Sequence, residues 1–519
     1  MPVLRAAIFA ALFLFSWVPV ARADDVTLRS RDGSLEISGT LLGFDGEFYR
    51  VDTEFGILTV DGSGVNCEGP ACPTLGSYLA RFTLSGARPM GEVLIPAMIE
   101  GFALNAGYAL SREALPGVGL LYRLFDETGG VPAAEITVRL TSSAEGFADL
   151  LGEQADIVLS LREVSSAERA MVRDAGLGDL RGIRQFRVIA RDALVPIVAP
   201  GNPVRRLTMD QLAAIYAGKI TRWSEVGGED APITLHLSQP ELGIGAVFLQ
   251  QVLLPRDARL ADETLIHSSV GLLADAVTED PFGIGISTFS RSRLGDVVTL
   301  TGDCAFEVAA SSASIKAGDY PLTAPMYLYL PARRLPKLAR DFLAYMRSGS
   351  AQLVTRRTGF VDQAFTEVPI DDQGLRFANA IRAAGLEVGL DELQRMMALL
   401  EGKRRVTTTF RFLGGSAVPD APSRANIALL AAALEAGTFD GRSLAFVGFS
   451  DGEGDAGQNR SLSQRRAEAV LSAVLGETEV FDRGKVTLIT DGFGEALPMA
   501  CDDTAWGRHV NRRVEIWVE

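Results

Sequence analysis

Apolar and polar residues alternate along this chain with a spacing that changes from segment to segment. Residues 24–73 contain four short runs in which the two kinds alternate, VTLRS, LEISGTL, EFYRVDT and GILTV, and turns containing Asp-Gly separate them. Alternation with a period of two, bounded by such turns, is typical of β-strands. The pattern predicts a small β module over 24–73.

The next segments follow a different order. Between residues 74 and 365, strand-like runs such as ITVRL, DIVLSL and ALVPIVAP alternate with helix patterns such as LTMDQLAAIYAG. This order predicts α/β units with largely parallel sheets. Residues 366–405 have apolar residues at helical spacing and predict a helical connector.

Residues 406–519 again alternate strand and helix patterns. The strand patterns are TTFRF, SLAFVGFS, KVTLIT and NRRVEIWV, and the helix patterns are RANIALLAAALEAG and LSQRRAEAVLSAVL. Ser461 and Gln464 form the S-x-x-Q pattern of a capping box, which predicts that the second helix begins there. The order predicts a βαβαββ sandwich, so the whole chain is predicted to be a multidomain α/β and α+β protein.

The N-terminus has the pattern of a secretory signal. Arg5 is followed by an apolar stretch, Ala6–Val20, and then by Ala21-Arg22-Ala23. A charged start, an apolar stretch and an A-x-A site are typical of a cleaved signal peptide. The stretch is shorter than the ~20 residues that span a bilayer. Residues 1–23 are therefore predicted to be a signal peptide, and the mature protein to be soluble and exported to the periplasm.

Composition and charge narrow the possible partners. The chain has 519 residues, 47% hydrophobic and 22% charged, with a net charge of -15 and a pI of about 4.9. These values are typical of a globular protein of several domains. A chain this acidic does not neutralise phosphate backbones, so we expect no nucleic-acid partner.

The four cysteines carry different expectations. Cys67 and Cys72 bracket a turn-like tetrapeptide, which in an exported protein favours a disulfide. A metal site is the weaker interpretation, because none of the three histidines lies near. Cys304 and Cys501 either pair across domains or remain two buried thiols, and the sequence leaves both open.

One segment raises the question of an enzyme. Gly448-Phe449-Ser450-Asp451-Gly452 matches the G-x-S-x-G nucleophile elbow, and His509 lies downstream. A glycine-containing loop, however, separates Ser450 from the next helix, whereas an elbow is a tight turn. Too little chain follows to complete a hydrolase sheet. We therefore expect no catalytic residue, metal or cofactor, and a serine hydrolase remains a remote alternative.

The last part of the chain carries four blocks in order: GFSDGEG from Gly448, NRSLSQRRA from Asn459, GFGEALP from Gly492 and GRHVNRRVE from Gly507. This set resembles the OmpA-like peptidoglycan-binding domain, with Phe449 where the family often has histidine. The resemblance implies that Asp451 and Arg466, with Ser450 and Asn459, hold the diaminopimelate of the wall peptide. An acid and a guanidinium match the ammonium and carboxylate of that zwitterion.

This resemblance also implies a place in the cell. It implies peptidoglycan as a partner and the periplasm beside the outer membrane of a Gram-negative envelope as the location. Arg512 and Arg513 are interpreted as strand arginines that pair with carboxylates within the fold.

Residues 196–228 read PIVAPGNPVRRLTMDQLAAIYAGKITRWSEVGG. This stretch resembles the phosphate-type (PstS-like) periplasmic substrate-binding proteins, and other pieces over residues 74–365 agree with it. The resemblance implies a type 2 periplasmic-binding-protein fold, whose two lobes close over a ligand, and an ABC permease as a partner. It implies a cleft formed by Ser85, Gly86, Arg88, Ser160, Gly243 and Gly245.

The cleft segments depart from the family. Ser238 stands where phosphate binders have arginine, Leu242 and Ile244 replace hydroxyl residues, and Leu161 replaces an aspartate or serine. We therefore expect the cleft to bind a polar or anionic solute other than free phosphate, or to bind phosphate weakly. Two functions remain: a solute-binding protein tethered to peptidoglycan, and an envelope-organising structural protein whose cleft is degenerate.

Overall fold

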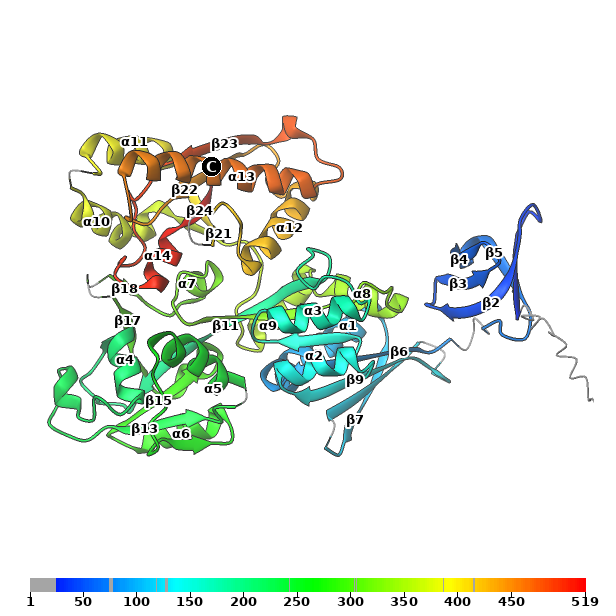
Figure 1. The fold of residues 1–519 in the computed structure, drawn as a ribbon, viewed down its shortest axis with the longest axis horizontal. Coiled ribbons are helices and arrows are strands. Elements are labelled where there is room, and N and C mark those ends of the chain that lie inside the picture. Colours follow the sequence, from blue (N-terminus) through cyan, green and yellow to red (C-terminus); the bar gives the residue numbers. More distant parts are fainter. Residues whose placement is uncertain are drawn as a thin grey trace, which may run out of the picture. The chain divides into compact units, whose positions relative to one another are not determined.

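The structure is a computed structural model. It describes residues 25–73, 78–117, 119–126, 129–241, 243–302, 304, 306–385, 387–413 and 416–519. The predicted signal peptide lies outside these residues. The chain divides into two units, one ending at Ala80 and the other beginning at Arg81, and each is described by itself (Figure 1).

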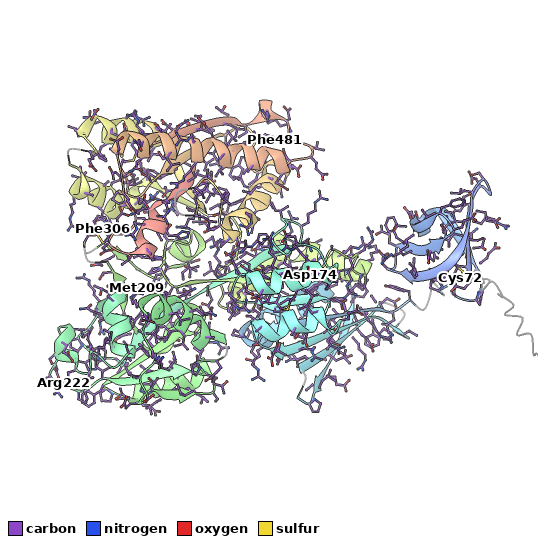
Figure 2. All side chains as sticks on the ribbon, in the orientation of Figure 1. Cys72, Asp174, Met209, Arg222, Phe306 and Phe481 are labelled. Carbon is purple, nitrogen blue, oxygen red and sulfur yellow. A yellow bond between two sulfur atoms is a disulfide. The ribbon has the colours of Figure 1, made fainter. Side chains whose placement is uncertain are left out.

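The N-terminal unit is an antiparallel five-stranded sheet with the order β4-β3-β2-β1-β5. Its strands are β1 (Val26–Ser30), β2 (Glu36–Phe44), β3 (Phe48–Thr53), β4 (Gly56–Asp61) and β5 (Val65–Glu68). The four predicted strands are confirmed, whereas the short and polar β5 gave no signal in the sequence. The predicted disulfide between Cys67 and Cys72 is present, with a Cα–Cα distance of 5.8 Å (Cys72 is labelled in Figure 2).

The second unit begins with two lobes that share one eleven-stranded sheet. The long strand β11 (Phe186–Val198) crosses between them, because its first half pairs with β19 (Thr323–Tyr329) and its second half with β15 (Gly283–Thr288). The first lobe adds β6 (Ala80–Ala87), β7 (Ala109–Leu115), β8 (Gly119–Phe125), β9 (Pro132–Thr141) and β10 (Ile157–Ser160). The second adds β13 (Thr234–Ser238), β14 (Leu265–His267) and β16 (Asp296–Val297). This is the expected two-lobed fold with crossing strands.

The expectation of largely parallel sheets is wrong. β6 pairs with β10 in parallel, and β13 pairs in parallel with β14 and β15. β8 pairs antiparallel with both β7 and β9. β19 pairs antiparallel with both β10 and β11. Strands joined by short turns, as β7, β8 and β9 are, can pair only in this way.

Helices cover both lobes. Those of the first lobe are α1 (Ile95–Ala106), α2 (Ser143–Leu151), α3 (Ser166–Asp174), α8 (Lys337–Tyr345) and α9 (Gly349–Arg357). Those that follow the crossing strand are α4 (Met209–Tyr216), α5 (Gly243–Phe248), α6 (Val270–Glu279) and α7 (Ser312–Lys316), beside a small sheet of β12 (Arg206–Thr208), β17 (Thr299–Thr301) and β18 (Glu307–Val308). The Thr208 side chain accepts from the Gln211 N–H and caps α4. The indole N–H of buried Trp223 donates to the Phe282 carbonyl. Much of the family-like stretch 196–228 therefore has a structural role.

The C-terminal part is a sheet with the order β20-β21-β24-β22-β23 and helices on both faces. Its strands are β20 (Glu367–Pro369), β21 (Arg404–Arg411), β22 (Ser443–Phe449), β23 (Thr487–Gly492) and β24 (Arg513–Val518). On one face, α12 (Ala421–Glu435) and α13 (Ala456–Glu477) pack on Phe446. On the other, α10 (Gly374–Ala383) and α11 (Leu390–Leu400) pack on Val447 and Trp517, so the stretch predicted as a connector contributes to this core.

Two local expectations are wrong. Helix α13 begins at Ala456 instead of near Ser461, because the Asp455 side chain accepts from the Gln458 N–H and caps the helix earlier. The last strand begins at Arg513 instead of Asn511. The preceding residues form α14 (Ala505–Asn511), because the Asn511 side chain bonds the backbone of Met499 and Ala500.

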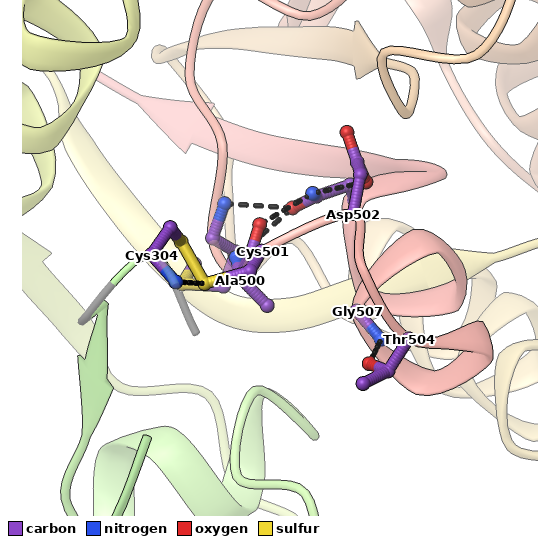
Figure 3. Close-up of a disulfide and its surroundings, with 8 residues drawn as sticks. Cys304, Ala500, Cys501, Asp502, Thr504 and Gly507 are labelled. Atoms are coloured by element: carbon purple, nitrogen blue, oxygen red, sulfur yellow. Dashed lines mark hydrogen bonds between the residues drawn. A yellow bond between two sulfur atoms is a disulfide. The ribbon is translucent and has the colours of Figure 1, made fainter. Parts of the chain in front are cut away.

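Cys304 and Cys501 form a disulfide between segments 197 residues apart in sequence (Figure 3). It joins the turn between β17 and β18 to the loop between β23 and α14. Of the two alternatives, the pair across domains is confirmed and the pair of buried thiols is wrong. Asp319, just after α7, adds a buried ion pair with Arg405 at 2.7 Å and another with Arg411 at 2.8 Å, both on β21. No helix within the described ranges has both the length and the apolar character that crossing a membrane requires.

Candidate functional site

The loop that follows β22 carries Asp451. Its side chain is 11% exposed, and Oδ2 accepts from Arg512 Nη1 at 2.6 Å. The loop is held on both sides, because the Ser450 N–H donates to the Gly494 carbonyl and the Gly452 N–H donates to Asp502 Oδ2. Asp451 is therefore a fixed and nearly desolvated carboxylate.

Arg466 lies on α13 and is fully buried, at 0% exposure. Its Nε and Nη2 both donate to the Ser416 carbonyl, at 3.2 and 3.1 Å, and its guanidinium lies 5.2 Å from the Phe412 ring centroid. Nη1 is buried and has no hydrogen-bond partner. Burial lowers the pKa of Arg466 to about 10, and Asp451 opposes this shift. A buried cation with an unused donor is costly unless an acceptor reaches it.

Together these residues form a set of alternating charges. The ion pair that Asp451 makes is with Arg512, and Arg466 lies close enough for the Asp451 charge to act on its pKa. The two arginines and one acid can receive a carboxylate and an ammonium carried on one carbon. Arg512 was expected to pair within the fold, and it does, but its partner is the aspartate of the candidate site. Its place in the GRHVNRRVE block was the one signal that could have indicated this.

Ser450 and Asn459 lie on the two sides of the same loop. Ser450 is 2% exposed and its Oγ has no partner, while Asn459 Nδ2 donates to the Glu453 carbonyl at 3.2 Å. An elbow serine needs a hydrogen bond to a base. Here His509 Nε2 lies 3.4 Å from Asp420 Oδ2 instead, so Ser450 and His509 do not form a catalytic pair.

An open cavity of about 350 Å³ lies beside this loop, between the end of α10 and the segment that follows β23. Glu387, Ser450, Glu495 and Asp502 line it. Burial, together with the negative charges of Glu387, Asp502 and Asp451, raises the pKa of Glu495 to about 7. Among the residues that the structure describes, the lining of this cavity gathers acid groups and includes no arginine, lysine or histidine.

Replacing Glu495 by glutamine tests this electrostatic strain. The raised pKa means that the folded state favours the protonated carboxyl of Glu495. The stability that this carboxyl contributes is therefore fully present below the unfolded pKa near 4.5 and is lost as the pH rises through about 7. After allowance for solvent screening, we expect wild type to lose about 1 kcal/mol relative to the variant between about pH 5 and about pH 8. Urea denaturation at both pH values measures this, and parallel pH profiles would contradict it.

The cleft between the lobes is a second candidate site. Its cavity of about 270 Å³ is lined from the first lobe by Arg88 and Glu92 and from the second by Ser238, Gly243 and Ser269, with Asp192, Ser290 and Arg291 from the crossing region. Arg88 Nη1 lies 4.0 Å from Glu92 Oε1, and both side chains are about half exposed. Ser238 is 7% exposed and its Oγ has no partner.

The structure brings only some of the predicted cleft residues together. Arg88 and Gly243 line the cavity. Ser85 instead contacts Asp149 at 2.5 Å, and Ser160 donates to the Arg162 carbonyl, both inside the first lobe. Gly86 and Gly245 allow close packing, because a Cβ would lie 2.0 Å from the Leu159 carbonyl oxygen and 2.3 Å from the Gln239 carbonyl oxygen.

Asp192 was not anticipated from the sequence. It is 2% exposed, and both the backbone N–H and the hydroxyl of Ser290 donate to it, at 3.1 and 2.7 Å. Burial raises the pKa of Asp192 to about 6. The cleft therefore combines hydroxyl groups, one buried acid and two arginines, which suits a small polar ligand. Asp192 lies inside the crossing strand and outside the family-like motifs, so the sequence gave no signal for it.

No group of three or more His, Cys, Asp and Glu side chains in the described part of the chain is arranged to hold a metal ion.

Comparison with known proteins identifies two domains. Residues 123–350 match the PBP superfamily domain and residues 411–512 match the OmpA family. The chain is 26% identical over 241 residues to the phosphate-binding protein PstS of Bacillus subtilis, covering 46% of this chain and 73% of that protein. It is 43% identical over 72 residues to outer membrane porin F of Pseudomonas aeruginosa, covering 14% of this chain and 20% of that protein.

A solved structure aligns with about half of this chain. An ABC-type phosphate transport receptor from Vibrio cholerae aligns with 54% of this chain and 99% of its own, with 18% identity and a TM-score of 0.42. The prediction that the chain is a binding protein and not an enzyme agrees with its similarity to PstS, which is named for phosphate binding.

Proposed function

We propose that this chain, which combines a PstS-like substrate-binding domain with a C-terminal OmpA domain, is a periplasmic solute-binding protein held noncovalently on peptidoglycan. Asp451 and Arg466 bind the diaminopimelate head of a wall peptide, and Arg512, Ser450 and Asn459 shape the site. The observation that carries the proposal is the unpartnered Nη1 of fully buried Arg466, close to the carboxylate of Asp451.

The charges of the site support a zwitterionic ligand. A ligand carboxylate that reaches Arg466 Nη1 satisfies a buried donor and gains a charge-assisted hydrogen bond. The Asp451 carboxylate, already oriented by Arg512, offers its charge to the ligand ammonium. The match of residues 411–512 to the OmpA family and the similarity of 72 residues to an outer membrane porin support a place in the Gram-negative envelope.

The choice of wall peptide tests the tether. Soluble wall fragments that carry diaminopimelate are expected to bind at least about tenfold more tightly than fragments with lysine at that position, because lysine lacks the second carboxylate, a loss of about 1.5 kcal/mol. Isothermal titration of the full chain measures both affinities. Equal affinities would contradict recognition of the zwitterion.

The cleft is proposed to bind a small anionic or polar solute, phosphate or a phosphorylated compound among them, for delivery to an ABC permease. Its two arginines and its hydroxyl groups support an anion, whereas Glu92 and Asp192 oppose a dianion. The similarity of this domain to proteins named for phosphate binding supports the same class of ligand.

Native mass spectrometry of the full chain purified from periplasm tests whether the cleft binds a small solute. We expect a retained small ligand that is released on denaturation. A chain mass with nothing bound would instead support the structural alternative, in which the protein organises the envelope and the cleft is degenerate.

A further inference from the structure

We propose that the open cavity between α10 and the loops at Ser450 and Glu495 binds a primary alkylammonium group. The cavity lies in the C-terminal part of the chain, on the side of the sheet that α10 covers. Its proposed ligand and its key carboxylates differ from those of the wall-binding set, so it can be tested with a simple amine.

The walls of the cavity differ in chemistry. The α10 side presents Ala380, Ala383, Ala384 and Gly385, whose small side chains leave a path for a methylene chain. The opposite side presents Ser450, Glu495 and Asp502. A chain of methylenes that ends in an ammonium fits a passage that is apolar along its length and acidic at its end.

The acid groups lack a cation of their own. Among the described side chains, no arginine, lysine or histidine forms an ion pair with Glu387 or Glu495, and Glu495 Oε1 is buried without a hydrogen-bond partner. Glu387 and Glu495 are instead close enough to share a hydrogen bond, which requires a proton on one of them. A ligand cation would replace that proton.

Asp502 differs from the two glutamates. Its Oδ2 accepts from the Gly452 N–H at 2.7 Å and its Oδ1 from Asn511 Nδ2 at 2.8 Å. Both bonds fix the carboxylate at the edge of the cavity. Asp451, the next acid, is already paired with Arg512.

The buried hydroxyl of Ser450 is an independent indication. Ser450 is 2% exposed, lines the cavity and makes no hydrogen bond through Oγ. An ammonium has three N–H donors and no acceptor. Ser450 Oγ, Glu495 Oε1 and a Glu387 oxygen supply three acceptors. A guanidinium is a planar fork and fits such a set less well than a compact ammonium.

Two kinds of molecule supply a primary alkylammonium group: a wall peptide with a free amine, and a free diamine in the periplasm. The full chain is titrated with 1,4-diaminobutane, with 1-butanol as the uncharged probe, at about pH 8, where Glu495 is ionised more readily. The readout is the melting temperature against ligand concentration. We expect saturable stabilisation by the amine and none by the alcohol.

Variants assign the effect to the cavity. Glu495→Gln and Glu387→Gln should each lower the affinity for 1,4-diaminobutane at least tenfold. Glu477→Gln, at an exposed position, should leave that affinity unchanged. Near-ultraviolet circular dichroism checks each fold, and the Glu387 variant keeps the test available if the Glu495 variant unfolds. No stabilisation by diaminobutane, or equal stabilisation of all variants, would overturn the proposal.

A soluble wall peptide with a free amine, compared with its acetylated form, identifies the source. If acetylation weakens binding to wild type but not to Glu495→Gln, the peptide amine enters the cavity. If acetylation has no effect while diaminobutane still binds, the source is a free amine. Loss of wall-peptide binding in Asp451→Ala with intact diaminobutane binding separates this site from the tether.

Discussion

Replacing Glu515 by glutamine is expected to lower the free energy of unfolding of the second unit by about 3–5 kcal/mol. Glu515 lies on β24 at 0% exposure and contacts Arg376 at 2.5 Å, Arg513 at 2.7 Å and Arg405 at 3.3 Å. The amide removes the negative charge and leaves these guanidinium groups buried without their shared counterion. Breaking such a set costs far more than losing a surface pair.

The pH dependence of this effect follows from the same contacts. Burial alone would raise the pKa of Glu515, but the three guanidinium groups hold it well below its ordinary value. The stabilisation is therefore present above the unfolded pKa and is lost progressively as the pH falls below about 4.5. The difference between wild type and variant should be large at about pH 7 and should shrink in acid.

Urea denaturation followed by tryptophan fluorescence measures the effect, because Trp517 Nε1 bonds Glu515 Oε2 at 3.1 Å. The exposed Glu401→Gln is the matched control and should change stability by less than about 0.5 kcal/mol. A Glu515 variant as stable as this control would show that the buried charges do not depend on one another.

Removing either member of the proposed wall clasp is expected to weaken binding of a diaminopimelate fragment by at least about 1.5 kcal/mol, which is more than tenfold. Asp451→Ala removes the acid that faces the ligand ammonium and also leaves Arg512 without its partner. Arg466→Ala removes the buried donor that no protein group satisfies. Isothermal titration of each full-length variant measures the loss.

Arg465 is a neighbouring control, because it is exposed on α13 while Arg466 is buried. Arg465→Ala should bind as wild type does. Arg466→Lys keeps the charge but loses the planar fork, so an intermediate affinity is expected. Unchanged binding by Asp451→Ala or Arg466→Ala would show that the ligand is held elsewhere.

Strands and helices with strong local patterns could be predicted from the sequence. The four β-runs of the N-terminal unit and the helix capped by Thr208 are present, because alternation and capping are local properties. The antiparallel pairing of β7, β8 and β9 and the helix α14 were missed. The first depends on strand order and the second on bonds that Asn511 makes to residues eleven and twelve positions earlier in the chain.

The candidate sites were predictable to different degrees. The blocks around Asp451 and Arg466 have a fixed spacing, so their residues could be named in advance, and the structure places them near each other. The cleft residues Asp192 and Ser290 come from segments 98 residues apart, and no local pattern connects them. Glu387 belongs to a stretch interpreted as a connector, so its approach to Glu495 became visible only in three dimensions.

Co-sedimentation of the full chain with purified diaminopimelate-type sacculi tests the central claim most directly. Wild type and Arg465→Ala are expected in the pellet, and the double variant Asp451→Ala/Arg466→Ala in the supernatant. Sedimentation of the double variant to the same extent as wild type, or wild type that stays in the supernatant, would contradict the account.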